Sequence, residues 1–277
     1  MLLKPFKQKA QLAEREVQHS KERLRLFVPV DFSSSSFNTL QYAMQIAKMC
    51  GGTIDLFHAM GIEDIPNSES PLSIQFELKK AETAAYAKLN SLKEIATEFG
   101  TTVSSCYVAM GDPLSSLKLR LSLCGSNLLV LSKSEKISHW TDLKLPMLSV
   151  PAMVMPKPPA RVLMIRDGEP VQERSLQPLL EILNYGKRQV TVIDCGPNDR
   201  KLQFNYWLQL GNTKVDFNHK YELVRATEKE IKRVVAKYTP DLICRAQKHK
   251  TWWEKLWSRA ASPEVDFDIP TLVLQIK

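Results

Sequence analysis

The chain has 277 residues, of which 44% are hydrophobic and 25% are charged, and its net charge is +8. This length accommodates two domains of ordinary size, and the composition is that of a soluble globular protein. No run approaches the roughly 18–20 apolar residues that span a bilayer, and the N-terminal segment lacks the apolar core of a secretion signal. We therefore predict a cytoplasmic protein without stable membrane association.

The positive charge is concentrated in two segments. Residues 1–25 hold seven Lys or Arg against three Glu, and residues 245–259 hold five Lys or Arg against one Glu, so each segment carries +4. Because these two segments account for the whole net charge, the sequence predicts no extended basic face and no nucleic-acid partner.

The first half of the chain alternates apolar strands with helical patterns. Strands are predicted at residues 24–30, 53–59, 103–108, 128–131 and 152–155. Helices are predicted from the serine run 33–36 to Gly51, at 74–99, and at 113–124. Strands that alternate with helices indicate a parallel sheet joined by right-handed crossovers.

The second half repeats the first after a proline cluster at residues 156–159. Residues 161–167 match 25–31 position for position. The later landmarks recur in the same order. Residues 175–179 match 36–40, and 270–274 match 151–155; the second, third and fourth strands of the first half correspond to 189–194, 215–221 and 241–244. The repeat predicts a basic arm at 1–23, one α/β domain at 24–156 and a second, degenerate one at 160–277.

A resemblance to a known family rests on VPVDFSSSSFNTLQYAMQIAKMCGGTIDLFHA, residues 28–59, and on MGDP, residues 110–113. These segments closely resemble a universal stress protein domain. The resemblance covers residues 24–155 and, more weakly, 160–276. It implies an α/β fold of two tandem universal-stress-like domains, each a five-stranded parallel sheet with helices on both faces, like the adenine nucleotide alpha hydrolases.

Nucleotide-binding members of this family hold ATP between the first and fourth strands. The resemblance assigns an adenosine pocket to Pro29, Val30, Asp31, His58, Ala59 and Gly111. In that assignment Asp31 meets the adenosine, the backbone of residues 58–59 flanks the base, and Gly111 lines the approach.

The family's phosphate-binding loop, G-x2-G-x9-G-[ST], is absent after the fourth strand. Ser132 and Glu135 stand at the first two glycine positions, where glycine lets backbone N–H groups approach phosphate closely. The second half has no glycine after Gly211. We therefore expect no cofactor and a function through protein contacts in stress response or signalling, with a protein partner or self-association.

An alternative keeps an adenine nucleotide, ATP or AMP, in the first domain. Lys133 and Lys136 can hold an anion as point charges, and the pocket around Asp31 can persist without the loop. Asp31 has an equally good structural interpretation as a helix cap. For Asp167, at the equivalent position of the second half, a cap or turn is the favoured interpretation.

Catalytic residues and metal ligands are not predicted. His58 is expected to be a hydrogen-bonded residue at a strand end, and the five histidines form no metal-binding motif. The five cysteines are widely spaced without a C-x-x-C pair, so neither a disulfide framework nor a zinc site is expected. The sequence therefore indicates a protein that is not an enzyme.

Residues 248–259 form the most distinctive local pattern. Trp252 and Leu256, and likewise Trp253 and Trp257, are four residues apart, so a helix here has an aromatic face opposite a basic one. We expect the tryptophans to pack over the second sheet in place of the missing loop; a docking surface for a partner or anionic lipid is the alternative. The family resemblance also implies that the two halves pack together through their last strands, 152–155 and 272–274, which would cover apolar edge strands.

Overall fold

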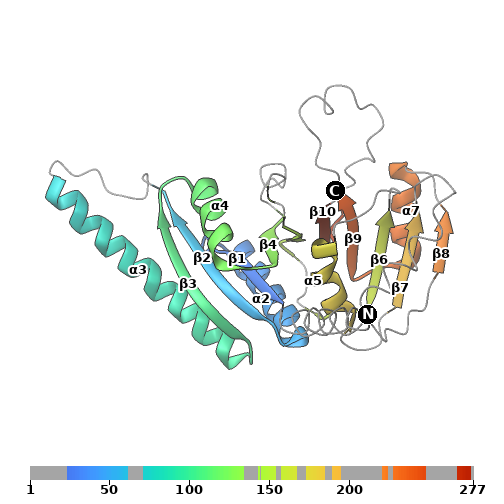
Figure 1. Ribbon diagram of the computed structural model, residues 1–277, viewed down its shortest axis with the longest axis horizontal. Helices are drawn as coiled ribbons and strands as arrows, with labels where there is room; N and C mark the ends of the chain where they lie inside the picture. Colours follow the sequence, from blue (N-terminus) through green and yellow to red (C-terminus); the bar gives the residue numbers. More distant parts are fainter. Residues whose placement is uncertain are drawn as a thin grey trace, which may run out of the picture.

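The structure is a computed structural model (Figure 1) that describes residues 24–61, 71–133, 143, 145–153, 157–166, 173–184, 189–194, 220–223, 227–247 and 267–275. The basic arm, Asp167 and the tryptophan segment 248–259 lie outside these residues. The first half contains β1 (Arg25–Pro29), α2 (Ser34–Cys50), β2 (Thr53–Met60), α3 (Pro71–Glu98), β3 (Thr102–Met110), α4 (Pro113–Cys124), β4 (Leu128–Ser132) and β5 (Met147–Val150). The second half contains β6 (Arg161–Arg166), α5 (Glu173–Asn184), β7 (Gln189–Asp194), β8 (Lys220–Leu223), α7 (Glu228–Tyr238), β9 (Leu242–Gln247) and β10 (Thr271–Gln275).

All these strands form one sheet in the order β3-β2-β1-β4-β5-β10-β9-β6-β7-β8. Within each half the strands are parallel, as the alternating pattern predicted. The halves meet where β5 and β10 run antiparallel, with Leu148 opposite Leu272. The halves thus pair through their last strands as predicted, but the pairing strand of the first half is Met147–Val150 and not residues 152–155.

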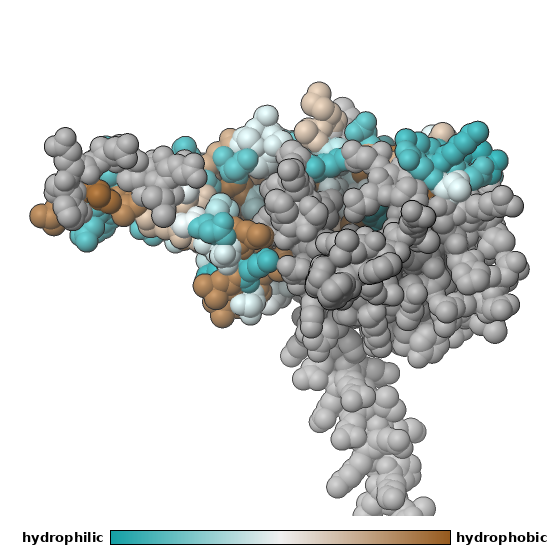
Figure 2. Space-filling model, turned by 90° about the horizontal axis from the view of Figure 1, so that it is seen from above, coloured by the Kyte–Doolittle hydropathy of each residue, from teal (hydrophilic) through white to brown (hydrophobic). Residues whose placement is uncertain are grey.

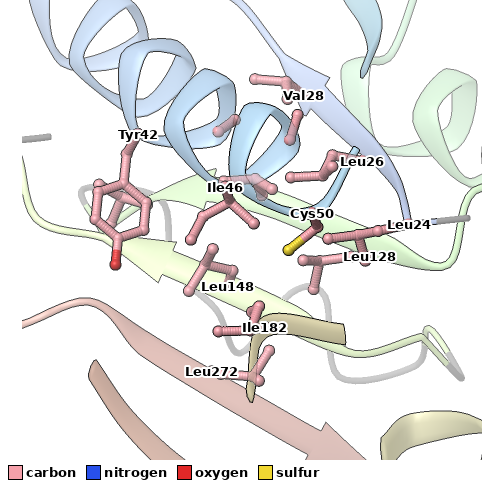
Figure 3. Close-up of a cluster of buried hydrophobic side chains, with 14 of the residues drawn as sticks. Leu24, Leu26, Val28, Tyr42, Ile46, Cys50, Leu128, Leu148, Ile182 and Leu272 are labelled. Atoms are coloured by element: carbon pink, nitrogen blue, oxygen red, sulfur yellow. The ribbon is translucent and has the colours of Figure 1, made fainter. Parts of the chain in front are cut away.

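Helices cover both faces of the sheet because its strands alternate their side chains between the faces. Along β1, Leu26 and Val28 join the apolar cluster under α2, whereas Phe27 joins a second cluster that contains Leu117 of α4. The cluster under α2 continues into the second half, and Figure 3 shows Leu148, Ile182 and Leu272 lying together near α2. One core thus spans the seam between the halves.

The repeat seen in the sequence recurs as matching hydrogen bonds. The N–H of Arg25 donates to Oδ1 of Asn127 (2.9 Å), and the N–H of Asn127 donates to the Arg25 carbonyl (3.0 Å). In the second half, the N–H of Arg161 donates to Oδ2 of Asp241 (3.0 Å), and the N–H of Asp241 donates to the Arg161 carbonyl (2.8 Å). Asn127 and Asp241 therefore hold corresponding strands together at their amino ends.

The predicted fifth strand at 152–155 is wrong, because β5 lies before Pro151 and not after it. Residues 152 and 153 form an exposed turn, while Met147–Val150 pair with β4 and β10. The true counterpart of Pro270 is Pro146, since their carbonyls accept from the corresponding N–H groups of Leu129 and Ile243 (both 3.0 Å). Both prolines precede a run of mostly apolar residues in the sequence, so only strand pairing distinguishes Pro146 from Pro151.

Helix α2 is positioned by its two ends. At its start, the hydroxyl of Ser33 accepts from the N–H of Ser36, which satisfies a helix N–H that lacks an intrahelical partner. At its end, Gly51 adopts a left-handed conformation with φ of 60°. The next residue, Gly52, lies so near the Leu24 carbonyl that a Cβ there would overlap it. The Gly-Gly pair thus lets α2 turn directly into β2.

Two further observations concern the hydropathy of the helices and the burial of the cysteines. Among the described residues, no helix combines the length and the hydropathy that crossing a membrane requires. The four described cysteines are free; Cys50, Cys124 and Cys244 are buried and Cys106 is half-buried. Cys195 lies outside the described residues.

Asp241 gives a pH-dependent prediction. Burial opposes its ionisation, but hydrogen bonds from Lys157 and Arg161 outweigh burial and lower its pKa to about 2. A carboxyl group whose pKa is lower in the folded state than in the unfolded state stabilises the fold at pH values above its unfolded-state pKa. This stabilisation is lost as the pH falls toward the folded-state pKa. Asp241→Asn copies Asn127 of the first half, so it should keep the backbone bonds, lose the ion pairs, and lower the free energy of unfolding by roughly 1–2 kcal/mol at pH 7.

Urea unfolding at several pH values checks this prediction. The difference between the natural protein and Asp241→Asn should shrink as the pH falls from about 5 to about 3, because the carboxyl of the unfolded state takes up a proton in this range while the folded-state carboxyl stays ionised. A difference that stays constant over this range would contradict the assignment.

The seam gives a second prediction. Leu272 is fully buried where β10 meets β5, so Leu272→Ala should lower the free energy of unfolding by about 2–5 kcal/mol through lost burial and the cavity left behind. Leu72 is 78% exposed on α3, and Leu72→Ala is the matched control, with an expected change within about 0.5 kcal/mol. Equal effects of the two substitutions in chemical denaturation would refute a core that spans the seam.

Candidate functional site

The candidate site lies at the carboxyl ends of β1 and β4. In an open parallel sheet, ligands bind outside the strand ends at the point where the strand order reverses. Here β1 pairs with β2 on one side and with β4 on the other, which makes the gap beyond β1 and β4 that point. The predicted residues Pro29, Val30 and Asp31 end β1, residues 58–59 end β2, and Gly111 follows β3. The structure therefore brings all six to one edge.

Asp31 is exposed and hydrogen-bonded within its own turn. One carboxylate oxygen accepts from the N–H (2.9 Å) and the hydroxyl (2.5 Å) of Ser33, the residue that caps α2. Burial raises the pKa of Asp31, but the hydrogen bonds from Ser33 and Ser36 outweigh it, so the pKa lies below the ordinary value. Asp31 thus holds the capping serine in place and does not cap the helix itself.

His58 joins the ends of β1 and β2. Its Nδ1 lies 2.7 Å from the carbonyl oxygen of Val30. Because a carbonyl only accepts, Nδ1 carries the proton in this bond. The N–H of Val30 donates in turn to the Phe57 carbonyl (2.7 Å). The prediction that His58 is a hydrogen-bonded strand-end residue is confirmed, and both backbone groups of Val30 are engaged.

Phe32 is the site residue that the sequence reasoning missed. Its φ of 62° is left-handed, a conformation that costs a residue with a Cβ about 1–2 kcal/mol. The Phe32 ring lies 4.4 Å from the His58 ring, measured between centroids, and the ammonium of Lys88 lies 5.0 Å from the Phe32 centroid. The only sequence signal was an aromatic residue at the start of a serine-rich turn. Phe32 therefore covers His58 at the edge where the family resemblance places the base.

Gly111 leaves the approach to this edge open. Its φ is 108°, and its N–H donates to the Met60 carbonyl at the end of β2 (3.0 Å). A Cβ at this position would have no atom within 4 Å. The next residue, Asp112, caps α4 by accepting from the N–H of Ser115 (2.7 Å). The MGDP motif thus acts here as a turn and a helix cap.

Lys133, the first residue after β4, points toward the second half. Its Nζ donates to the Phe267 carbonyl (2.6 Å) and lies 3.4 Å from Oδ1 of Asp268. Its backbone N–H donates to the Val150 carbonyl at the end of β5 (2.8 Å). Glu135 and Lys136 lie outside the described residues. The ammonium that we considered as an anion ligand is thus engaged by the loop that leads into β10.

A buried ion pair occupies the opposite edge of the same strands. Asp55 has no exposed side-chain surface and accepts from Nε (2.7 Å) and Nη2 (3.0 Å) of Arg25 and from the hydroxyl of Ser126 (2.9 Å). This network ties β1, β2 and the segment before β4 together. In the part of the chain that the structure describes, no three His, Cys, Asp or Glu side chains converge to hold a metal.

The left-handed backbone of Phe32 predicts that glycine and alanine variants have opposite orders of stability at positions 32 and 37. Both Phe32→Gly and Phe32→Ala remove the ring, but only glycine accepts the positive φ without strain, so Phe32→Gly should be the more stable by about 1–2 kcal/mol. Phe37 lies one turn into α2 and is partly exposed; there alanine should be favoured over glycine by about 1 kcal/mol. Thermal or urea unfolding of the four variants tests both orders. Alanine favoured at both positions would mean that the turn relaxes.

We compared the chain with protein families, curated proteins and solved structures. No protein-family model matches the sequence, and no curated protein is significantly similar to it. Among solved structures, a universal stress protein from Archaeoglobus fulgidus superposes with a TM-score of 0.65 at 17% identity, over 92% of this chain and 97% of that one. A protein of unknown function from Pseudomonas aeruginosa superposes with a TM-score of 0.56 at 15% identity, over 94% of each chain. The cytoplasmic domain of a prokaryotic cation chloride cotransporter gives 0.50 at 14% identity, over 91% of this chain and 95% of that one. The chain therefore has the fold of a tandem universal stress protein.

Proposed function

We propose that this chain is a cytoplasmic, non-catalytic member of the universal stress protein family, with domains at 24–156 and 160–277. It acts in stress response or signalling through protein contacts, and it does not use the family's ATP-binding mode. In this proposal the fold supplies a rigid frame, and the surfaces of the two domains carry the function.

The observation that carries this proposal is the tilted contact between the Phe32 and His58 rings, whose planes meet at 45°. A base that enters beside the backbone of residues 58–59 has to displace the Phe32 ring, which also holds the Lys88 ammonium above it. On the phosphate side, the Lys133 ammonium already has the Phe267 carbonyl as a partner. These contacts support a site whose two ends are engaged by groups of the chain itself. The absence of the glycine loop in the sequence supports the same conclusion.

The alternative function, adenine-nucleotide binding by the first domain alone, is favoured by a different observation. Asp31 is exposed at the reversal point of the strand order, and the space beside Gly111 is open. If the Phe32 ring moves away from His58, a nucleoside can enter beside Gly111. Its hydroxyl groups can then donate to the Asp31 carboxylate. The two functions differ in a single measurable property, the affinity for ATP or AMP.

A titration decides between them. We expect no saturable binding of a fluorescent ATP analogue or of AMP up to about 100 μM, because the sequence after β4 lacks the glycines that let backbone N–H groups surround the phosphates. Micromolar binding that Asp31→Ala abolishes would overturn the proposal and establish the alternative. Glu228→Ala, which removes an exposed acid from α7, is the matched control and should leave any binding unchanged.

A further inference from the structure

Strand β3 ends the sheet in the first half, with β2 as its neighbour on the inner side (Figure 1). Cys106 of β3 belongs to the apolar cluster that contains Leu89 of α3. The next residue, Tyr107, belongs to the opposite cluster, which contains Leu117 of α4. The two helices thus cover the two faces of β3, and among the strands that the structure describes none lies along its outer edge.

β3 is also the most accessible strand of the first half. Only Val103 of its nine residues is buried, whereas every residue of β4 and β5 is buried. The register with β2 shifts at Ser104, and such a bulge disturbs an edge locally. The residues after it, Ser105–Met110, pair regularly with Asp55–Met60. Figure 2 shows both apolar and polar groups at the surface of this end of the molecule.

The regular part of β3 lacks the features that keep an edge strand from pairing. Natural sheets shorten their exposed edge strands or place charged residues and prolines on them. The segment SCYVAM, residues 105–110, contains neither a charge nor a proline. At the other end of the described sheet, β8 has four residues, and two of them, Lys220 and Glu222, are charged. The end at β3 is therefore the one that suits pairing with a further strand.

Two cations lie beside this edge, one on each face. Lys93 follows Leu92, which packs against the cluster on the α3 face. Burial raises the pKa of the Cys106 thiol, and the Lys93 ammonium opposes this rise, so the ammonium lies near β3. On the α4 face, the guanidinium carbon of Arg120 lies 3.3 Å from the centroid of the Tyr107 ring. In the part of the chain that the structure describes, neither cation forms an ion pair, and the buried Nε of Arg120 has no hydrogen-bond acceptor.

The edge and its two cations define the chemistry of an occupant. Unpaired N–H and C=O groups are satisfied by an extended backbone, and an added strand directs alternate side chains to the two faces of the sheet. Acidic side chains on an added strand can therefore reach Lys93 on one face and Arg120 on the other. A second copy of β3 fits less well. Its antiparallel pairing sets the same helix of each copy on the same face, which brings like charges together.

We propose that Ser105–Met110 of β3 binds an extended acidic segment of a partner protein as an additional strand, with Lys93 and Arg120 as its charge partners. The inference deepens the proposed function and rests on it in one respect, that the chain acts through protein contacts. The main-chain bonds of the added strand supply the affinity. The two cations select acidic over basic segments, because like charges at an interface disfavour the wrong partner.

The test uses the full chain and three fluorescein-labelled peptides of ten residues, followed by fluorescence anisotropy. The acidic peptide consists of valine and threonine with glutamate at positions 4 and 7, which lie on opposite faces of a strand. The basic peptide has lysine at both positions. The third peptide is the acidic one with prolines at positions 5 and 6, which cannot donate to a strand ladder.

Two protein variants and a matched control test the role of the cations. Lys93→Glu reverses the charge of an exposed side chain on the α3 face, and Arg120→Gln removes the charge on the α4 face. The matched control is Lys79→Glu, at another exposed position of α3, about 21 Å along the helix from Lys93.

We expect saturable binding of the acidic peptide, at least about tenfold tighter than that of the basic one, and no saturable binding of the proline peptide. Lys93→Glu should weaken binding at least about threefold, because an exposed ion pair becomes a repulsion, and Arg120→Gln should weaken it in the same direction. Lys79→Glu should change the affinity by less than about 1.5-fold. No binding of the acidic peptide, equal binding of the proline peptide, or equal effects of Lys93→Glu and Lys79→Glu would each overturn the proposal.

Hydrogen exchange locates the bound peptide. The acidic peptide should slow amide exchange in residues 105–110, because their outward N–H groups gain acceptors, and should leave the strand at the other end, Lys220–Leu223, unchanged. Slower exchange elsewhere without a change in residues 105–110 overturns the proposal.

Two outcomes separate this inference from others. Sedimentation that shows a dimer, with residues 105–110 protected in the absence of peptide, would assign the edge to a second copy of the chain and overturn the proposal. Failure of the proposed function is distinguishable, because it is detected as ATP or AMP binding at the edge beyond β1 and β4. That result leaves the effect of Lys93→Glu on peptide binding unchanged.

Discussion

The antiparallel pairing of β5 with β10 is the constraint on which the rest of the molecule depends. Each half alone ends its sheet in an edge strand, and unpaired edge N–H and C=O groups need a partner. The pairing supplies that partner and sets Leu148 against Leu272 in a core shared by both halves. Because the two strands run in opposite directions, the carboxyl end of β4 lies beside the segment before β10. That geometry lets Lys133 reach the Phe267 carbonyl.

At the candidate site, the strand order of the fold is kept while an aromatic ring lies against the end of β2. The strand order still reverses beside β1, and Asp31, His58 and Gly111 still gather at that edge. The turn after β1 instead directs Phe32 onto His58, at the expense of a left-handed backbone. A strained residue persists only where its surroundings hold it; here the His58 ring and the Ser33 cap of α2 do so. The strain indicates a conformation selected by packing at the site.

The two halves show which parts of a duplicated unit are free to diverge. The bond between the first and fourth strands is kept, although Asn127 has become Asp241 and has gained ion pairs with Lys157 and Arg161. The left-handed residue after the last covering helix is kept too, as Gly125 and as Thr239. Two exposed positions of α4, Leu119 and Leu123, correspond to the exposed Arg233 and Lys237 of α7. Positions that set strand geometry are constrained by backbone bonds, whereas outer helix positions respond to what the surface meets.

The sequence by itself determined the strands, the helices and the repeat, because these follow from local apolar periodicity, glycine stops and capping residues. The resemblance to the universal stress family, rather than periodicity, indicated that Asp31, His58 and Gly111 share one edge. The sequence placed the fifth strand wrongly, because Pro146 and Pro151 have the same local context and only pairing with β4 and β10 separates them. The left-handed Phe32 and the outward leucines of α4 were decided by tertiary structure alone. Both depend on which side chains lie across the sheet, and contacts between residues far apart in the chain leave no periodic trace in the sequence.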